Sequence, residues 1–236
     1  MIFQYSLKHG TVPDTWKRAT ITPIFKSEDR TSAENYRPIS ITSQLCKLLE
    51  KLIRKQLMDH LVDNKILSEH QHGFCNKRSC MTNLLEALDE ITELVDEGMC
   101  VDELFLDFRK AFDKVSHIKL LHKLRSVGIT GIFLQWIHSF LADRVQRVKV
   151  NNSCSTWRDV TSGVPQGSVL GPVLFLIFIN DLPEGIKTNC KLFADDSKIY
   201  GKAETVEDRN RIQEDIDTCY RWAKLWSMQF HLKKCI

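Results

Sequence analysis

The sequence has no long hydrophobic run. Its longest near-continuous apolar segment covers residues 169–179, only eleven positions, and is interrupted by Gly171-Pro172. A membrane-spanning helix needs about 20 apolar residues, so we predict a buried helix or strand here and no membrane partner. The N-terminus, MIFQYSLKHG, also lacks the basic-then-apolar layout of a secretory signal.

Paired cysteines are missing as well. The eight cysteines form no CxxC pair and have no regular spacing. A chain of 236 residues that is 43% hydrophobic can bury its own core without disulfides, so we expect reduced thiols and an intracellular location, nuclear or cytoplasmic. His70, His72, Cys75 and Cys80 lie close in sequence, but their spacing matches no common zinc module, and a zinc site there is disfavoured.

Charge of one sign is not dominant either. The net charge of +3 and the pI near 8.4 permit a nucleic-acid partner without requiring one. Basic side chains cluster at residues 47–55 and 144–149, and each cluster alone is explained by a solvated face. Repeats, low-complexity tracts and linkers are missing, which favours one α+β domain.

Hydrophobic periodicity and turn residues predict helices alternating with strands. An extended segment covers residues 36–40, because Pro38 disfavours a helical conformation at Arg37. The apolar stripes of the first two long helices contain Leu45, Leu48, Leu49, Leu52, Ile53 and Leu57, then Leu84, Leu85, Leu88, Ile91 and Leu94. We expect helices over about 43–57, 82–98, 118–127, 132–141 and 205–227, and strands over 101–108, 144–150, 155–160 and on both sides of Asp195-Asp196.

Asp195 and Asp196 are adjacent carboxylates between two short strand-like runs. Neighbouring side chains on a strand point to opposite faces, so the two can share a direction only at a tight turn. Two negative charges there are costly unless a cation is near, and hard oxygen ligands suit Mg²⁺. Taken alone, the pair is weak evidence for a metal site, because Asp-Asp in an ordinary solvated turn is common.

Asp107 supplies a third carboxylate, at the end of an apolar strand. A charge there is costly unless it is paired or bound to metal, although it could simply cap the next turn. If the strands are neighbours, Asp107 and Asp195 could hold two Mg²⁺ ions about 3.5–4 Å apart, as in-line phosphoryl transfer requires. Phe112 could pack beneath the sugar of a bound nucleotide; core packing is the alternative.

The segment 163–172 has glycines at intervals of four, with Gln166 beside Gly167. It is not a phosphate-binding GxxxxGK[ST] loop, because no lysine follows the glycines. Glycine allows close backbone approach to a ligand, so a turn beside a nucleobase or a template backbone fits. An ordinary turn before a buried helix is the alternative.

Several motifs occur in one order along the chain: VPDTWKRATITPIFK, NYRPIS, QHGF, FRKAFD, GVPQGSVLGP, INDLP and FADD. In this order they resemble the reverse transcriptases of non-LTR retrotransposons, especially jockey-like and chicken-repeat-like elements. The resemblance covers essentially the whole chain. It implies an α+β right-hand polymerase fold with fingers mainly over residues 1–100 and palm mainly over 101–236, where a fingers-like insertion is also possible.

The resemblance also implies an activity and its partners. The implied activity is RNA-directed DNA polymerisation with two Mg²⁺ ions, for which Mn²⁺ is a possible substitute. The implied partners are an RNA template, a DNA primer and deoxynucleoside triphosphates. The implied catalytic residues are Asp107, Asp195 and Asp196, joined in the metal set by Phe108. The implied nucleotide-binding residues are Lys26, Arg37, Ala111, Phe112 as the sugar gate, Gln166 and Gly167, and the implied nucleic-acid contacts are Arg78, Arg144 and Arg147.

This sequence departs from the family pattern at some positions. Cys75 replaces a usual arginine and His231 a usual asparagine, and Lys233 or Lys234 matches the lysine of the last palm motif. We expect a truncated domain without thumb or endonuclease, that is, a fragment or a decayed copy. Two alternatives stay open: a catalytically inactive remnant that binds nucleic acid weakly, and a metal-dependent nuclease, which would leave the glycine segment unexplained.

Overall fold

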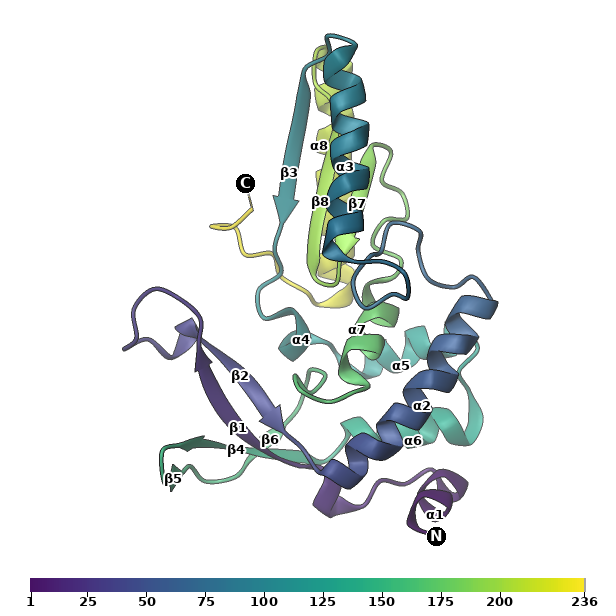
Figure 1. The fold of residues 1–236 in the computed structure, drawn as a ribbon, viewed down its shortest axis with the longest axis vertical. Coiled ribbons are helices and arrows are strands. Elements are labelled where there is room, and N and C mark those ends of the chain that lie inside the picture. The colour runs from purple at the N-terminus through teal and green to yellow at the C-terminus, as the bar shows by residue number, and fades with distance from the viewer. Residues whose placement is uncertain (236) are drawn as a thin grey trace. The chain divides into compact units, whose positions relative to one another are not determined.

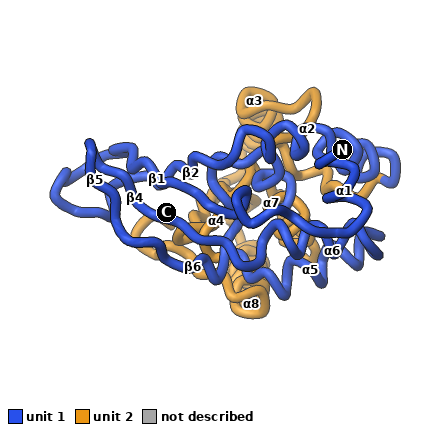
Figure 2. The backbone as a smooth tube through the Cα atoms, turned by 90° about the horizontal axis from the view of Figure 1, so that it is seen from below, with its two compact units in different colours: residues 1–64, 115–174 blue, residues 65–114, 175–236 orange. Residues whose placement is uncertain are grey.

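The computed structural model describes residues 1–235, and its backbone divides into two compact units (Figures 1 and 2). Unit 1 consists of residues 1–64 and 115–174, and unit 2 of residues 65–114 and 175–236. Each unit is therefore assembled from two separate stretches of chain. The predicted assignment of residues to fingers and palm stays a prediction.

Unit 1 contains a sheet with the strand order β2-β1-β4-β5, in which β6 also pairs with β4. Its strands are β1 (Arg18–Phe25), β2 (Tyr36–Ile41), β4 (Arg144–Val150), β5 (Ser153–Cys154) and β6 (Arg158–Val160). β1 pairs antiparallel with β2 and parallel with β4. The predicted hairpin after residue 144 is therefore present, with the chain returning along β4 twice, as β5 and β6.

The helices of unit 1 are α1 (Ile2–His9), α2 (Gln44–Asp63), α5 (His117–Ser126) and α6 (Gly131–Leu141), with 3₁₀ turns at Asp14–Trp16 and Ala33–Asn35. Ser43 caps α2 by accepting a hydrogen bond from the N–H of Cys46, which stabilises the helix start. Trp136 of α6 is fully buried, stacks on Phe140, and donates its indole N–H to Ser6 of α1. Burial of the Trp136 ring and the hydrogen bond from its indole N–H thus join α6 to α1.

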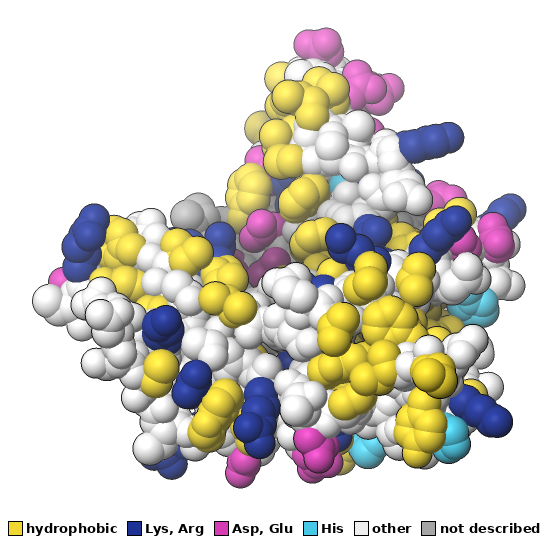
Figure 3. Space-filling model, turned by 60° about the horizontal axis from the view of Figure 1, so that its bottom comes forward, with side chains coloured by type: hydrophobic (Ala, Val, Ile, Leu, Met, Phe, Trp, Pro, Cys, Tyr) yellow, Lys and Arg dark blue, Asp and Glu magenta, His cyan; other side chains and the backbone are white. Residues whose placement is uncertain are grey.

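The apolar stripe predicted for α2 is only half correct. Leu49, Ile53 and Leu57 are buried, whereas Leu45, Leu48 and Leu52 are each more than half exposed. The stripe is wider than the face that packs, because a helix can bury only the side that meets a neighbour. Figure 3 shows hydrophobic side chains gathered on part of one face of the chain, with Lys and Arg side chains scattered across it.

Unit 2 contains a three-stranded antiparallel sheet, with β8 (Asp196–Lys202) between β3 (Val101–Leu106) and β7 (Asn189–Phe193). Two long helices, α3 (Cys80–Asp96) and α8 (Val206–Trp226), run along this sheet (Figure 1). The short helix α4 (Ala111–Lys114) follows β3, and α7 (Gly171–Ile179) crosses from unit 1 into unit 2. Within residues 1–235, we find no helix with both the length and the apolar character needed to cross a membrane.

The predicted inward face of α3 is only partly correct, because Ile91 and Leu94 are partly buried but the other three predicted residues are exposed. Leu84, Leu85 and Leu88 are 46–57% exposed, while Asn83 and Ala87 are the buried residues of this helix. Asn83 donates a side-chain hydrogen bond to the carbonyl of Leu192 on β7. Polar bonds and a small residue, rather than leucines, therefore set the orientation of α3 on the sheet.

Candidate active site

Asp195 lies at the tip of the tight turn between β7 and β8. Phe193 pairs with Asp196, so Ala194 and Asp195 form a two-residue connection. Ala194 adopts the left-handed conformation, with φ at 56°, which residues other than glycine rarely occupy. The predicted tight turn is present, and it brings both aspartates to one end of the sheet.

Asp107 lies at the same end. β3 is antiparallel to β8 with Leu106 opposite Ser197, and one further residue in this register places Asp107 across from Asp196. The Nζ atom of Lys234 is 3.1 Å from Oδ2 of Asp107, and the N–H of His231 donates to the carbonyl of Asp107. Strand pairing thus brings Asp107 to the same end of the sheet as Asp195 and Asp196, although Asp107 precedes Asp195 by 88 residues in sequence.

The donor chemistry of this strand end fits a hard divalent cation, because all three side chains offer carboxylate oxygens. In residues 1–235 as they stand, no three Asp, Glu, His or Cys side chains are close enough together to hold an ion. The Lys234 ammonium instead neutralises Asp107. The residues that would hold Mg²⁺ or Mn²⁺ are Asp107, Asp195 and Asp196.

Aromatic stacking fixes the segment that follows Asp107. Phe108 is buried and stacks on Phe230, with ring centroids 4.4 Å apart. Ala111 is also buried, at the start of α4. Phe112 is half-buried and stacks on Phe175 of α7, again at 4.4 Å and nearly parallel. This stack holds the Phe112 ring in one orientation while leaving part of it accessible.

In unit 1, the predicted glycine-lined turn is pinned to β2. The carbonyl of Gln166 accepts a hydrogen bond from the N–H of Ser40 at 2.7 Å. Gly167 has φ at 110°, and a Cβ on it would lie 2.6 Å from the carbonyl oxygen of Ser40. No other residue fits without moving the backbone, so glycine is required for this close approach.

Glu50 is a buried polar residue beside the glycine-lined segment that the sequence reasoning did not single out. It is fully buried on α2, and its Oε2 accepts from the N–H groups of Val169 and Leu170 just before α7. Those N–H groups would otherwise be orphaned near a helix start. The one available signal was a glutamate on the apolar side of α2, between Leu49 and Ile53.

The predicted phosphate-binding cations Lys26 and Arg37 lie on the β1–β2 hairpin of unit 1. Both side chains are exposed. Arg37 is opposite Ile24 in the strand register, and the N–H of Lys26 donates to the carbonyl of Asn35. The hairpin therefore presents two cations near its tip.

The three arginines predicted to contact nucleic acid have different surroundings. Arg78 donates to the carbonyls of Glu69 and Gln71. Arg144 is 3% exposed, donates to the carbonyl of Phe140 and lies over that ring. The Arg147 guanidinium is 4.8 Å from the centroid of the Trp157 ring, which Arg18 also approaches. Only Arg147 combines partial exposure with an aromatic support.

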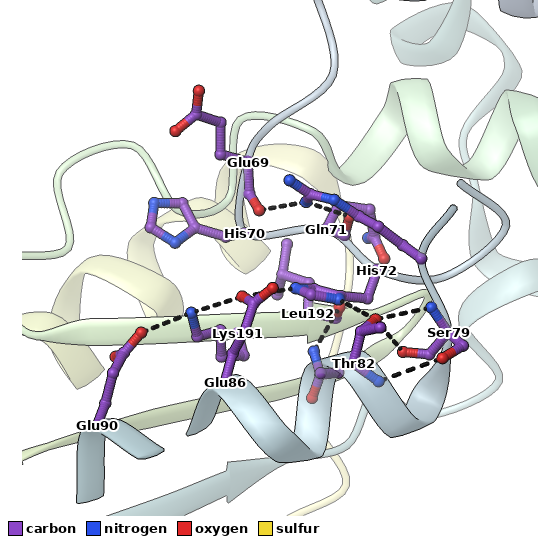
Figure 4. A network of polar contacts seen from close by, with 12 residues as sticks. Glu69, His70, Gln71, His72, Ser79, Thr82, Glu86, Glu90, Lys191 and Leu192 are labelled. Carbon is purple, nitrogen blue, oxygen red and sulfur yellow. Dashed lines mark hydrogen bonds and ion pairs between the residues drawn. The ribbon is translucent and has the colours of Figure 1, made fainter. Parts of the chain in front are cut away.

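A polar network connects α3 to β7 in unit 2 (Figure 4). His72 is fully buried, with Nδ1 2.9 Å from Oγ1 of Thr82 and Nε2 3.2 Å from a carboxylate oxygen of Glu86. Burial lowers the pKa of His72 more than Glu86 raises it. Lys191 bridges Glu86 and Glu90, and these bonds hold the pKa of Lys191 above its usual value despite burial. The pKa of His72 is thus held below its usual value, next to the ion pairs that Lys191 forms with Glu86 and Glu90.

Sequence comparisons identify similar proteins. A family model described as reverse transcriptase (RNA-dependent DNA polymerase) matches residues 24–236. Over its whole length the chain is 33% identical to the probable RNA-directed DNA polymerase from transposon BS and 30% identical to the RNA-directed DNA polymerase from mobile element jockey, both from Drosophila melanogaster. The chain spans 27% of the length of each.

Structural comparison supports the fold. The chain superposes with a TM-score of 0.67 on apo telomerase from Candida tropicalis truncated from its C-terminal domain, covering 100% of this chain and 53% of that one at 12% identity. It gives the same TM-score on telomerase from Candida albicans in complex with a TWJ fragment of telomeric RNA, covering 99% of this chain and 44% of that one at 13% identity. The predicted mixture of helices and strands is confirmed.

Proposed function

Because the chain belongs to the reverse transcriptase (RNA-dependent DNA polymerase) family, we propose that it adds deoxynucleotides to a primer 3′-hydroxyl under the direction of an RNA template. The family predicted from the motifs is confirmed. The observation that carries the proposal is the convergence of Asp107, Asp195 and Asp196 at one end of the β3-β8-β7 sheet. A right-hand arrangement of fingers and palm is part of this proposal.

The three carboxylates have defined roles in the proposal. Asp107 and Asp195 are the principal ligands of two Mg²⁺ or Mn²⁺ ions, with Asp196 and the backbone of Phe108 beside them. Such ions lower the pKa of an attacking hydroxyl and neutralise charge on a triphosphate. Lys234, now paired with Asp107, provides a positive charge that remains available to the phosphates when the carboxylates bind metal.

The nucleotide would be recognised by cations, a ring and a turn. Lys26 and Arg37, both exposed on the β1–β2 hairpin, suit the triphosphate. Phe112, held by Phe175, would exclude a 2′-hydroxyl by steric contact, with Ala111 beside it. The Gln166-Gly167 turn, fixed on Ser40, would present backbone to the nucleotide and template.

Template and primer would be held through their phosphates, and Arg147 is the arginine best suited to this. Trp157 supports both Arg147 and Arg18, and no carboxylate lies within ion-pair distance of either guanidinium in the described part of the chain. Two cations without acidic partners favour a phosphate. Arg78 is engaged by carbonyls, and the burial of Arg144 argues against direct contact.

The test is extension of a DNA primer annealed to RNA, with Mg²⁺ and deoxynucleotides. Asp195→Ala should abolish extension, whereas Asp217→Ala, which removes an exposed carboxylate of α8 bonded to Gln213, should leave it unchanged. Extension that survives Asp195→Ala would overturn the proposal.

The same assay separates the two other candidates. Binding of RNA that weakens steeply with salt, without nucleotide incorporation, would support a catalytically inactive remnant, and Arg147 beside the Trp157 ring favours that candidate next. Metal-dependent cleavage of labelled RNA would support a nuclease.

A further inference from the structure

The segment of residues 70–73 joins the edge of the unit 2 sheet next to the aspartate turn. Gln71 and Leu192 form a parallel bridge. The N–H of His72 donates to the carbonyl of Leu192, and the N–H of Leu192 donates to the carbonyl of His70, at 2.9 and 2.8 Å. The backbone of residues 70–72 therefore runs beside β7 as far as the turn.

The side chain of Gln71 is bonded to the turn itself. Only 1% of this residue is exposed. Its Oε1 accepts from the N–H of Ala194 at 2.9 Å and from the N–H of Gly73 at 2.7 Å, while its Nε2 donates to the carbonyl of Ala194 at 3.4 Å. One buried amide thus restrains both backbone polar groups of the residue that precedes Asp195.

Gly73 allows this contact to form. A Cβ at position 73 would lie 2.3 Å from the nitrogen and 3.0 Å from the Cα of Ala194, distances at which the backbone must move. Ala194 is also the residue in the left-handed conformation, which is disfavoured for alanine. The close approach therefore occurs where the backbone of the turn is strained.

The segment that carries Gln71 is itself held in place by Arg78 and by α3. Arg78 donates to the carbonyl of Gln71 at 2.8 Å. His72, the next residue, is held through Thr82 and Glu86 of α3 (Figure 4). The segment cannot move away from the turn without breaking several buried polar bonds, each of which is costly to leave unmade.

We propose that Gln71 is a positioning residue that holds Ala194 in its left-handed conformation and thereby sets the direction of the Asp195 carboxylate. This inference rests on the proposed function of Asp195 as a metal ligand. Neighbouring carboxylates repel one another, so a turn that carries two of them needs a backbone restraint to keep both directed at a shared cation. The amide of Gln71 provides that restraint.

The test compares Gln71→Met with Gln71→Glu and with the control Gln213→Met. Methionine preserves the length of the side chain and removes all three bonds. A glutamate at position 71 is kept in its neutral form by burial and can still accept from Ala194 and donate to it. Gln213 is exposed on α8 and donates to Asp217 of the same helix.

Three quantities are measured on the full chain: hydrogen exchange of the amides at residues 193–197, Mn²⁺ affinity by electron paramagnetic resonance, and kcat and KM for nucleotide incorporation. In Gln71→Met, exchange at the turn should accelerate about tenfold, Mn²⁺ affinity should fall several-fold, and kcat should fall about tenfold with KM nearly unchanged. Gln71→Glu should recover most of each loss, and Gln213→Met should resemble the wild type.

Several outcomes would overturn the inference. The first is that hydrogen exchange at the turn and Mn²⁺ affinity are unchanged in Gln71→Met. The second is that hydrogen exchange accelerates equally along α8 and at the turn, which would indicate only a general loss of stability. The third is that Gln71→Glu loses as much Mn²⁺ affinity and kcat as Gln71→Met. If Gln71→Met does not fold, Gly73→Ala provides the same three readouts. A wild-type chain that binds Mn²⁺ but incorporates no nucleotide would contradict the proposed function, while exchange and Mn²⁺ affinity would still decide the role of Gln71.

Discussion

The buried carboxylate of Glu50 accepts a hydrogen bond from the N–H of Val169 at 2.7 Å, across 119 residues of sequence. The same oxygen accepts from Leu170. This glutamate thereby anchors the chain at the point where the Gly163–Pro172 segment leads into α7.

Replacing Glu50 should therefore destabilise unit 1. Glu50→Met keeps the side-chain length but leaves two buried N–H groups without an acceptor, so the free energy of unfolding should fall by about 2–4 kcal/mol. Urea denaturation provides the measurement. The matched control is Glu34→Met, at an exposed position, and a loss no larger than in that control would contradict the anchoring role.

Phe112 is predicted to control the choice of sugar. Phe112→Val replaces the ring that Phe175 holds in place with a smaller side chain. The kcat/KM for ribonucleotides should therefore rise relative to that for deoxynucleotides by about tenfold or more. Single-nucleotide incorporation with each substrate measures this ratio. Phe3→Val, at a ring that meets Trp16 edge-on, is the control. A proportional loss with both substrates would instead indicate that Phe112 only packs the core.

The stability of the protein should decrease in mild acid because of His72. Burial holds the pKa of His72 below 6.5 in the folded chain, so below pH 6.5 the unfolded chain binds a proton that the folded chain does not. The stabilisation is complete above the unfolded pKa and is lost as the pH falls through this window. Burial also lowers the pKa of His117 in unit 1, so this histidine should likewise reduce stability as the pH falls.

Urea denaturation between about pH 7.5 and 5.5 tests this prediction, because histidines titrate in that range. Removing the ring in His72→Gln should flatten part of the slope. Glu86 does not interfere: Lys191 and His72 lower its pKa against the effect of burial, so its contribution is lost only at lower pH. An NMR titration that places the His72 midpoint above 6.5 would refute the prediction.

The cysteine thiols should fall into a group that is alkylated quickly and a group that is alkylated slowly. Burial raises the pKa of Cys46, Cys190 and Cys219 to about 12, so these thiols stay protonated and unreactive in the folded chain. The exposed cysteines are Cys80, Cys100 and Cys154, and they should react first with iodoacetamide. Peptide mass spectrometry identifies the modified positions, and early labelling of Cys190 in folded protein would contradict the burial of β7.

The sequence by itself determined the local elements and the family. Periods of 2 and 3.6 located most of the helices and strands but missed α1 and β1, and a tight turn at Asp195-Asp196 followed from the need for both carboxylates to share a direction. The ordered motifs identified the reverse transcriptase family, which the family match over residues 24–236 confirms. The roles of individual site residues stay predictions.

Only the tertiary structure decided which polar side chains act on residues distant in sequence. Gln71 contacts Ala194 across 123 residues and Glu50 contacts Val169 across 119, and no local pattern records such a pairing. The same reason explains the exposed leucines of α2 and α3: periodicity shows that a helix has an apolar face, but the partner determines which part is buried. Strand register likewise brings Asp107 to Asp196, because hydrogen bonds between strands fix neighbours that the chain itself holds far apart.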